Sequence, residues 1–231
     1  SALELDQIKK GFLYKLGKKL ELAIYNSAKG FVFPVPGFRS YLDSLSDKIS
    51  KKPKFELMNG VSNDFIKKSK SIQAVSKSFT VLYSGNMGLA QDLQTIIQAA
   101  DILKDYNINF NFIGDGVCKT EIKELAKPLS DKVFFYDSIE RDKVVQAIKN
   151  ASICLVPLKD KKIFENALPS KMFEYMACER PIIVSIRGEA KKLVKDARAG
   201  IAIEPEDPHA LSEAILSYYN NKYKCKKHGH N

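Results

Sequence analysis

From residue 79 onward, short apolar runs alternate with helical patterns, and this alternation restricts the fold more than any other feature of the chain. The apolar runs are nearly continuous and comprise residues 79–85, 109–116, 132–138, 152–158, 180–186 and 200–205. Amphipathic helical patterns follow them at residues 93–104, 119–127, 140–151, 170–178, 189–199 and 208–221. Buried strands joined by helix-sized crossovers form a parallel sheet with helices on both faces. The sequence therefore predicts an α/β fold built on a doubly wound, Rossmann-like parallel sheet.

The first 70 residues follow a different plan. A helical pattern covers residues 3–28, and the rest reads as a strand (30–35), a short helix (37–45), a strand (54–59) and a polar linker (67–71). Two βα units at most are too few for an independent domain. We therefore expect residues 1–70 to be the remnant of a second, N-terminal α/β domain with its hinge, and residues 71–231 to be the main ligand-binding domain.

The charge of the chain is distributed unevenly. The 231 residues carry a formal net charge of +10, and the first 70 hold 14 Lys and Arg against 7 Asp and Glu. This asymmetry predicts an acidic partner for the N-terminal part. We expect no nucleic acid, because no zinc-ligand spacing, RNP-like aromatic motif or helix-turn-helix signature is present. An anionic membrane surface is the favoured partner, and a lysine-rich face that contacts only water is the alternative.

Several features indicate a cytoplasmic protein. No apolar run approaches the roughly 18 residues that a membrane span needs, and no secretory signal is visible. The four cysteines have no C-x-x-C spacing, which indicates reduced thiols. His228 and His230 stand near the C-terminus in an H-x-H pattern, and we expect both to be exposed and without a role.

Two glycine-rich turns follow the first two of these strands. Gly85 and Gly88 close the turn after the first strand, where bare backbone can approach an anion. The spacing is not a dinucleotide fingerprint, because Gln91 stands where a third glycine is required. Gly114 and Gly116 form the second turn, which can equally be a simple strand exit.

A third candidate site lies at the start of the helix predicted at residues 170–178. Pro169 suits a helix start, and the free amides around Ser170, together with the cation of Lys171, favour a phosphate group. Glu174 lies on the same helix face as Ser170 and can accept two hydrogen bonds from a diol such as ribose. In the alternative interpretation Ser170 caps the helix, Lys171 lies in water and Glu174 only favours the helix dipole. The stripe expected to anchor this helix to the sheet consists of Phe173, Met176 and Ala177.

Ligands of open parallel sheets bind beyond the carboxyl ends of the strands. All three candidate sites fall at that edge of the predicted sheet, and together they favour a nucleotide.

The segment "ALPSKMFEYMACERPIIVS" resembles the P-x-x-x-x-E-A-M-A-x-G-x-P-V-I segment of retaining GT-B glycosyltransferases of the family-4 type, particularly those that build bacterial surface polysaccharides. "VLYSGNMGLAQDLQTIIQAA", "FNFIGDG" and "VFFYDSIERDKVVQAIKNASICLVPL" are similar, in order, to the first four strands of the donor-binding domain. "IYNSAKGFVFPVPGFRSYL" and "FELMNGVSNDF" are similar to the end of the acceptor domain and the hinge. The likeness covers about residues 20–220.

This resemblance implies that residues 71–231 bind a nucleotide-diphosphate sugar for transfer, with retention, to a saccharide or lipid-linked acceptor. It implies a hexosyl or N-acetylhexosaminyl transferase that needs no cofactor and no metal. Glu174 would bind the ribose, and Glu165 and Asn166 would lie near the donor sugar. The diphosphate residues would be Gly85, Asn86, Gly88, Ser170 and Lys171. The base residues would be Asp137, Ser138 and Ile139.

The chain departs from the family pattern at named positions. The family's pair of glutamates has seven residues between them, but Asn166 stands eight places before Glu174, with Glu165 one step away. The arginine and lysine usual in the first loop align with Asn86 and Gln91. Most of the acceptor domain is missing as well, including its histidine near the reacting centre. We therefore expect this chain alone to bind the donor without catalysing transfer.

Two other functions remain open at this stage. A non-catalytic nucleotide-binding module would use the same glycine turns and helix start. A Rossmann oxidoreductase needs an acidic residue at the end of the second strand and a glycine-rich first turn, and only half of this is present. For the transferase, we expect a cytoplasmic location that is peripheral on the inner face of the membrane.

Overall fold

Six parallel strands form the central sheet, in the order β5-β4-β3-β6-β7-β8. The computed structural model describes residues 11–75 and 78–230. The strands of this sheet are β3 (Phe79–Ser84), β4 (Ile108–Ile113), β5 (Val133–Tyr136), β6 (Ile153–Pro157), β7 (Ile182–Ser185) and β8 (Gly200–Ile203). Each overlaps a predicted apolar run, and the reversal of strand order between β3 and β6 is that of a doubly wound sheet. The predicted α/β fold is confirmed.

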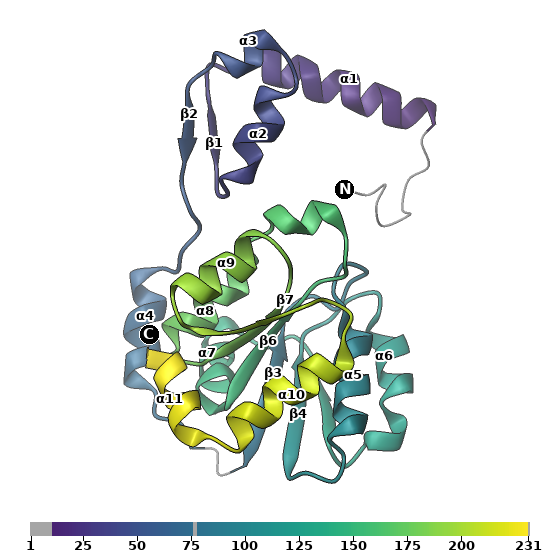
Figure 1. Ribbon diagram of the computed structural model, residues 1–231, viewed down its shortest axis with the longest axis vertical. Helices are drawn as coiled ribbons and strands as arrows, with labels where there is room; N and C mark the ends of the chain where they lie inside the picture. The colour runs from purple at the N-terminus through teal and green to yellow at the C-terminus, as the bar shows by residue number, and fades with distance from the viewer. Residues whose placement is uncertain (1–10, 76–77, 231) are drawn as a thin grey trace.

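Helices cover both faces of this sheet (Figure 1). One layer consists of α5 (Leu93–Ile102), α6 (Lys119–Leu125) and α10 (Pro208–Tyr219), with η1 (Lys127–Leu129) after α6. The other consists of α7 (Arg141–Asn150), α8 (Ser170–Ala177) and α9 (Glu189–Asp196). Neighbouring strand residues point to opposite faces, so Tyr83 packs in the first core whereas Leu82 packs in the second. Each face of the sheet is therefore covered by its own hydrophobic layer, and the predicted site lies at the carboxyl edge of the sheet.

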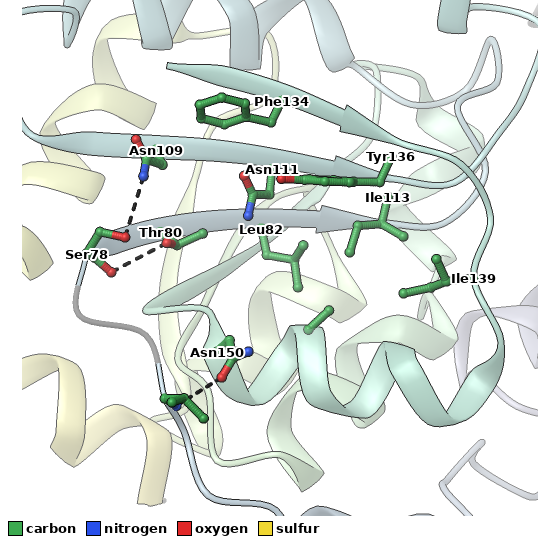
Figure 2. Close-up of a pocket in the computed structure, with 12 residues that line it drawn as sticks. Ser78, Thr80, Leu82, Asn109, Asn111, Ile113, Phe134, Tyr136, Ile139 and Asn150 are labelled. Atoms are coloured by element: carbon green, nitrogen blue, oxygen red, sulfur yellow. Dashed lines mark hydrogen bonds between the residues drawn. The ribbon is translucent and has the colours of Figure 1, made fainter. Parts of the chain in front are cut away.

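The first part of strand β4 is buried on one face only. Phe110 and Phe112 are buried, whereas Asn109 and Asn111 on the opposite face are half-exposed. Figure 2 shows these amides beside Phe134 and Tyr136 of β5, in a cavity of about 650 Å³ that reaches α7. The near-continuous run predicted here is thus an alternating strand, because α7 does not cover this part of the sheet.

A smaller unit lies above the larger one in Figure 1. It contains α1 (Phe12–Ser27), β1 (Phe31–Phe33), α2 (Gly37–Asp43), α3 (Asp47–Ser50) and β2 (Lys54–Glu56), with β1 and β2 parallel. Phe33, Leu42 and Ile49 form its core. An apolar stripe of α1 faces outward, and Phe12 at its start is 79% exposed. Residues 3–10 of the predicted first helix lie outside the described residues.

The predicted polar linker is instead a helix, α4 (Asn63–Ser71), and it packs on the larger unit. The Ser62 hydroxyl accepts a hydrogen bond from the Phe65 amide (3.3 Å) and so caps the helix. Phe65 is buried against the second core, and Ser69 Oγ donates to the carbonyl of Ala177 (2.8 Å). The linker prediction was wrong because the apolar residues of this short segment were too few to reveal a helical period.

One further helix, α11 (Lys222–His230), follows α10. Its His228 is not idle: Nδ1 lies 2.8 Å from the Tyr218 hydroxyl, and burial lowers the pKa of the imidazole. The expectation of an exposed His228 was therefore wrong, whereas His230 is exposed. Among the helices of residues 11–75 and 78–230, none is long and apolar enough to cross a membrane.

Candidate functional site

The two glycine turns meet at the carboxyl edge of the sheet. The Gly85 amide donates to the carbonyl of Ile113 (2.9 Å), and the Met87 amide donates to that of Asp115 (2.7 Å). Gly114 has a φ of +136°, and a side chain there would overlap the Gly85 carbonyl. Only glycine allows this approach, so the loops after β3 and β4 form one continuous backbone surface.

Helix α8 begins beside this surface. Pro169 is the N-cap residue, and no side chain caps the helix. Ser170 is the first helical residue and is exposed, so the interpretation of Ser170 as a capping side chain is not what the structure shows. The Tyr175 hydroxyl accepts from the Ser84 amide (3.0 Å) and lies 3.2 Å from the Ser84 carbonyl. This buried tyrosine ties the helix to the end of β3, and sequence reasoning did not identify it.

Lys171 extends from α8 across the first turn. Its Nζ lies 4.0 Å from the centre of the Tyr83 ring, and a Cβ atom on Gly85 would lie 2.9 Å from that Nζ. Burial lowers the pKa of Lys171 to about 8, and the nearby Glu174 carboxylate opposes this shift. Lys171 therefore does not lie in water, as the alternative interpretation required. It is a half-buried cation held over a glycine turn.

Glu174 lies one turn further along α8, and its side chain is 30% exposed. Its Oε1 is 3.9 Å from Nη2 of Arg141, the first residue of α7. A pair at this distance with an exposed arginine is weak. The carboxylate therefore keeps accessible oxygens at the carboxyl edge of the sheet, and Arg141 is a neighbour that sequence spacing could not reveal.

The loop after β5 contributes unequally to the site. Ser138 and Ile139 line a cavity of about 330 Å³ together with Gly85, Asn86 and Gly114. Asp137 does not line this cavity. Lys119 Nζ donates to the Asp137 carboxylate (2.7 Å) and to the Gly114 carbonyl (2.8 Å), and the hydrogen bond from Lys119 lowers the pKa of Asp137. Lys119 thus joins the loops after β4 and β5.

Gly88 is buried and closes the β3 loop on itself. Its amide donates to the Gln91 side chain (3.0 Å), and a Cβ atom at this position would lie 2.6 Å from the Asn86 amide nitrogen. Gln91, where a dinucleotide fingerprint needs glycine, therefore holds the shape of the loop.

Glu165 and Asn166 lie apart from that cavity, in the 3₁₀ helix η2 (Lys162–Asn166), and both are exposed. The Asn166 side chain lies so close to Gly37, the first residue of α2, that a side chain at Gly37 would overlap it. In Figure 1, η2 lies on the side of the larger unit that faces the smaller one. These two residues therefore lie where the two units approach each other.

The buried face of α8 differs from the predicted stripe. Met172, Tyr175 and Cys178 are fully buried in the second core, whereas Phe173 is only half-buried and Met176 and Ala177 pack at the margin of that core. The prediction was wrong because the spacing of apolar residues allowed two faces, and the polar hydroxyl of Tyr175 was not counted among the anchors. Within the described part of the chain, no group of three or more His, Cys, Asp or Glu residues could hold a metal ion.

Comparisons with known proteins match this architecture. The model of the family described as "Glycosyl transferases group 1" matches residues 64–231. An uncharacterized glycosyltransferase of Methanocaldococcus jannaschii is 29% identical over 134 residues, which cover 57% of this chain and 36% of the relative. The putative colanic acid biosynthesis glycosyl transferase WcaI of Escherichia coli is 27% identical over 139 residues, 58% of this chain and 34% of the relative. The match thus spans about a third of the length of these relatives.

Solved structures share the fold at low identity. A TarM variant of Staphylococcus aureus, in complex with fondaparinux, alpha-GlcNAc-glycerol and UDP, has a TM-score of 0.71 at 17% identity, covering 93% of this chain and 41% of TarM. Sucrose-phosphate synthase of Thermosynechococcus elongatus has a TM-score of 0.72 at 18% identity, covering 97% of this chain and 58% of that chain. Anabaena HepE, in complex with UDP and glucose, has a TM-score of 0.62 at 16% identity, covering 88% of this chain and 57% of HepE.

Proposed function

Because this chain belongs to the group 1 glycosyl transferases, we propose that its six-stranded sheet binds a nucleotide-diphosphate sugar, the donor for glycosyl transfer. The observation that carries the proposal is Lys171, whose Nζ lies over Gly85 beside the uncapped start of α8. A cation and free helix amides at one point form a site for an anion. The solved structures of TarM and HepE with UDP give independent support.

The diphosphate lies, in this proposal, between the β3 loop and the start of α8. Gly85, Asn86 and Gly88 offer backbone and an amide side chain, and Ser170 and Lys171 offer helix amides and a cation. These groups offset the diphosphate charge without a divalent ion, so neither metal nor cofactor is required. Lys171 takes the place of the arginine and lysine that the chain lacks in its first loop.

The nucleoside follows from the same placement. Glu174 keeps accessible carboxylate oxygens near the start of α7, and it accepts two hydrogen bonds from the ribose hydroxyls. The base enters the cavity of about 330 Å³ lined by Ser138 and Ile139. Because the Asp137 side chain is bonded to Lys119, Asp137 contributes to base binding through its backbone.

The sugar of the donor extends toward η2. Glu165 and Asn166 lie there, against the start of α2, and they contact the hexose or N-acetylhexosamine. The acceptor, a saccharide or a lipid-linked saccharide, approaches from the side of the smaller unit. Transfer occurs with retention in the complete enzyme, at the inner face of the membrane in polysaccharide biosynthesis.

Titration of the chain with UDP, GDP and their sugars tests this function. We expect saturable binding of one nucleotide, and tighter binding of the matching nucleotide sugar. The absence of binding to all four ligands would exclude the proposal. The anomeric configuration of the product formed by the complete gene product, read by NMR, tests retention. A complete gene product that binds nucleotide but transfers no sugar would instead be the non-catalytic module.

A further inference from the structure

A second cavity, of about 450 Å³, opens at the amino-terminal edge of the same sheet, opposite the proposed donor site. Its walls come from the residues that precede β6 and β7 and from α11. The charged side chains that line it are mostly cationic, and they are Lys149, Glu179, Arg180, Lys222 and Lys226, with His230 beside them. A cavity of this size is in the range of small-molecule sites.

Arg180 is the unusual member of this set. Its Nε atom is buried and has no hydrogen-bond partner among the described residues. Buried polar atoms in native proteins are nearly always paired, so an unpaired guanidinium N–H on the wall of a cavity calls for an acceptor. The backbone of Arg180 is held in place, because its amide donates to the Tyr175 carbonyl (3.1 Å) and Pro181 follows it.

Among the described residues that line the cavity, Glu179 is the one acid, and it is already engaged. Glu179 Oε2 lies 3.3 Å from Nζ of Lys149, a lysine whose side chain is only 8% exposed. The backbone of Glu179 has a φ of +57°, a conformation that residues other than glycine rarely adopt. Lys149 is thereby neutralised within the protein, whereas the described residues that line the cavity offer Arg180, Lys222 and Lys226 no further carboxylate.

Helix α11 is fixed over this edge of the sheet. Cys225 Sγ donates to the carbonyl of Ser152 (3.3 Å), and the Tyr218 hydroxyl meets His228. Lys222 and Lys226 lie one turn apart on this helix and line the same cavity as Arg180. Three cations from two separate segments therefore line one open cavity.

We propose that this cavity binds a small anion that carries a phosphate group, at a site separate from the donor site. A guanidinium donates two parallel hydrogen bonds to phosphate oxygens, and two neighbouring ammonium groups add further positive charge for a multiply charged anion. A carboxylate, with a single negative charge, would leave more of the cationic charge unmatched than a phosphate group does. Binding that turns the guanidinium toward the anion gives the buried Arg180 Nε–H an acceptor that the described residues do not supply.

Inorganic pyrophosphate is the probe for this site, and the Nε–H resonance of Arg180 in a ¹⁵N-labelled chain is the direct readout. The resonance is assigned by its loss in Arg180→Gln. We expect pyrophosphate to shift it in a saturable way. Because pyrophosphate also enters the donor site, the titration is repeated in Lys171→Met, where the Arg180 shift must persist.

Calorimetry gives the second measurement. We expect Arg180→Gln to weaken this binding about tenfold, as loss of a bidentate charged contact does. Lys222→Gln combined with Lys226→Gln is expected to weaken pyrophosphate binding as well. Both lysines are exposed, so the double change leaves the fold intact. Lys104→Gln combined with Lys123→Gln removes the same charge from exposed positions that do not line the cavity and serves as the control. UDP binding remains unchanged in all of these variants.

Vesicles distinguish a free anion from a lipid headgroup. The test uses a chain that carries Lys15→Gln and Lys19→Gln, so that α1 does not hold the vesicle. If phosphatidylglycerol vesicles, but not phosphatidylcholine vesicles, shift its Arg180 resonance, the phosphate belongs to a lipid. If only soluble pyrophosphate shifts it, the ligand is free. An Arg180 resonance that neither probe moves, or pyrophosphate binding that the control pair weakens as much as the Lys222 and Lys226 pair does, overturns the proposal.

Discussion

The Nζ atom of Lys171 lies 4.0 Å from the centre of the Tyr83 ring, at the carboxyl end of β3. The ring face partly compensates the ammonium group for the water that it loses on burial. The compensation is incomplete, because burial still lowers the pKa of Lys171 to about 8. Folding thus places a cation where it is costly for the protein alone and useful once an anion binds.

Replacing Lys171 with methionine is therefore expected to stabilise the chain and to weaken nucleotide binding. The folded pKa of about 8 lies below the ordinary value of 10.5, so the charged lysine destabilises the fold below pH 8. This cost disappears as the pH rises from about 8 toward 10.5. At pH 7 we expect Lys171→Met to raise Tm by about 2–4 °C, which is ~1 kcal/mol in a chain of this size.

Thermal denaturation and calorimetry on the same samples check this pair of effects. Lys161→Met, at an exposed lysine nearby, is the matched control and is expected to change neither quantity. A Lys171→Met chain that is less stable at pH 7, or that binds UDP and GDP as the wild type does, would contradict the assigned role.

The pH dependence of nucleotide binding gives a second test of the same lysine. A diphosphate favours the protonated amine, so binding raises the pKa of Lys171 above its free value of about 8. Affinity is then constant just below this pH and falls as the pH rises above it, by up to about tenfold per pH unit. Titrations in buffers of different ionisation enthalpy are expected to show proton uptake on binding near pH 8.5. Equal affinity at pH 7.5 and 9.5 contradicts this prediction, and Lys171→Met is expected to lose the dependence.

Divalent metal ions are expected to be unnecessary for binding. Lys171 and the free amides at the start of α8 face the proposed diphosphate position, so the anionic charge is met by the protein. Isothermal titrations in EDTA and in Mg²⁺ or Mn²⁺ are expected to give the same affinity. Binding seen only with metal present refutes this part of the proposal.

Association with anionic membranes is the fourth prediction. Lys15 and Lys19 of α1 are exposed next to the outward-facing stripe of Phe12, Leu16 and Leu20. Each lysine near an anionic surface contributes about 1 kcal/mol, and this contribution weakens as the salt concentration rises. We expect the full-length protein to bind phosphatidylglycerol vesicles at low ionic strength and to release them in salt.

The matched variants for this test differ only in the position of the removed charge. Lys15→Gln combined with Lys19→Gln is expected to reduce vesicle binding, whereas Lys123→Gln combined with Lys127→Gln leaves it intact. Nucleotide affinity is unchanged in both. Vesicle binding that survives loss of Lys15 and Lys19 at low salt would mean that these lysines contact only water. Lys9 and Lys10, which precede α1, lie outside the described residues.

The main sheet could be predicted because its signal is local. Each buried strand is a short apolar run with its own flanking turn, so residues 79–84 and 182–185 stand out in the sequence without tertiary information. Helix α4 could not be found in this way. Charged residues dominate its pattern. The helix is supported by the packing of Phe65 against the second core, whose other residues lie far away in the sequence.

The candidate site likewise combines local motifs, which the sequence shows, with contacts between distant residues, which it does not show. Glycine turns and the start of α8 are local motifs, so Gly85, Ser170 and Lys171 could be proposed as site residues from the sequence. The hydrogen bond from the Ser84 amide to the Tyr175 hydroxyl joins residues 91 positions apart in the chain. The salt bridge between Arg141 and Glu174 depends on how α7 and α8 are placed. Asp137 was predicted to face the base, but its side chain is bonded to Lys119 on another element. Such pairings arise only after the sheet has assembled.

The most direct measurement is a titration of wild type and Glu174→Ala with UDP and GDP by calorimetry, with unfolding followed in parallel. Two hydrogen bonds to a carboxylate contribute about 1.5–3 kcal/mol each, so loss of Glu174 is expected to weaken binding at least about tenfold. Glu213→Ala, which removes the same side chain from an exposed position on α10, is expected to bind as the wild type does. Both variants unfold within a degree or two of the wild type, because each glutamate is partly or fully exposed to water. If instead Glu174→Ala binds either nucleotide as tightly as the wild type, or neither nucleotide binds the wild type at all, the carboxyl edge of this sheet is not a nucleotide-sugar site.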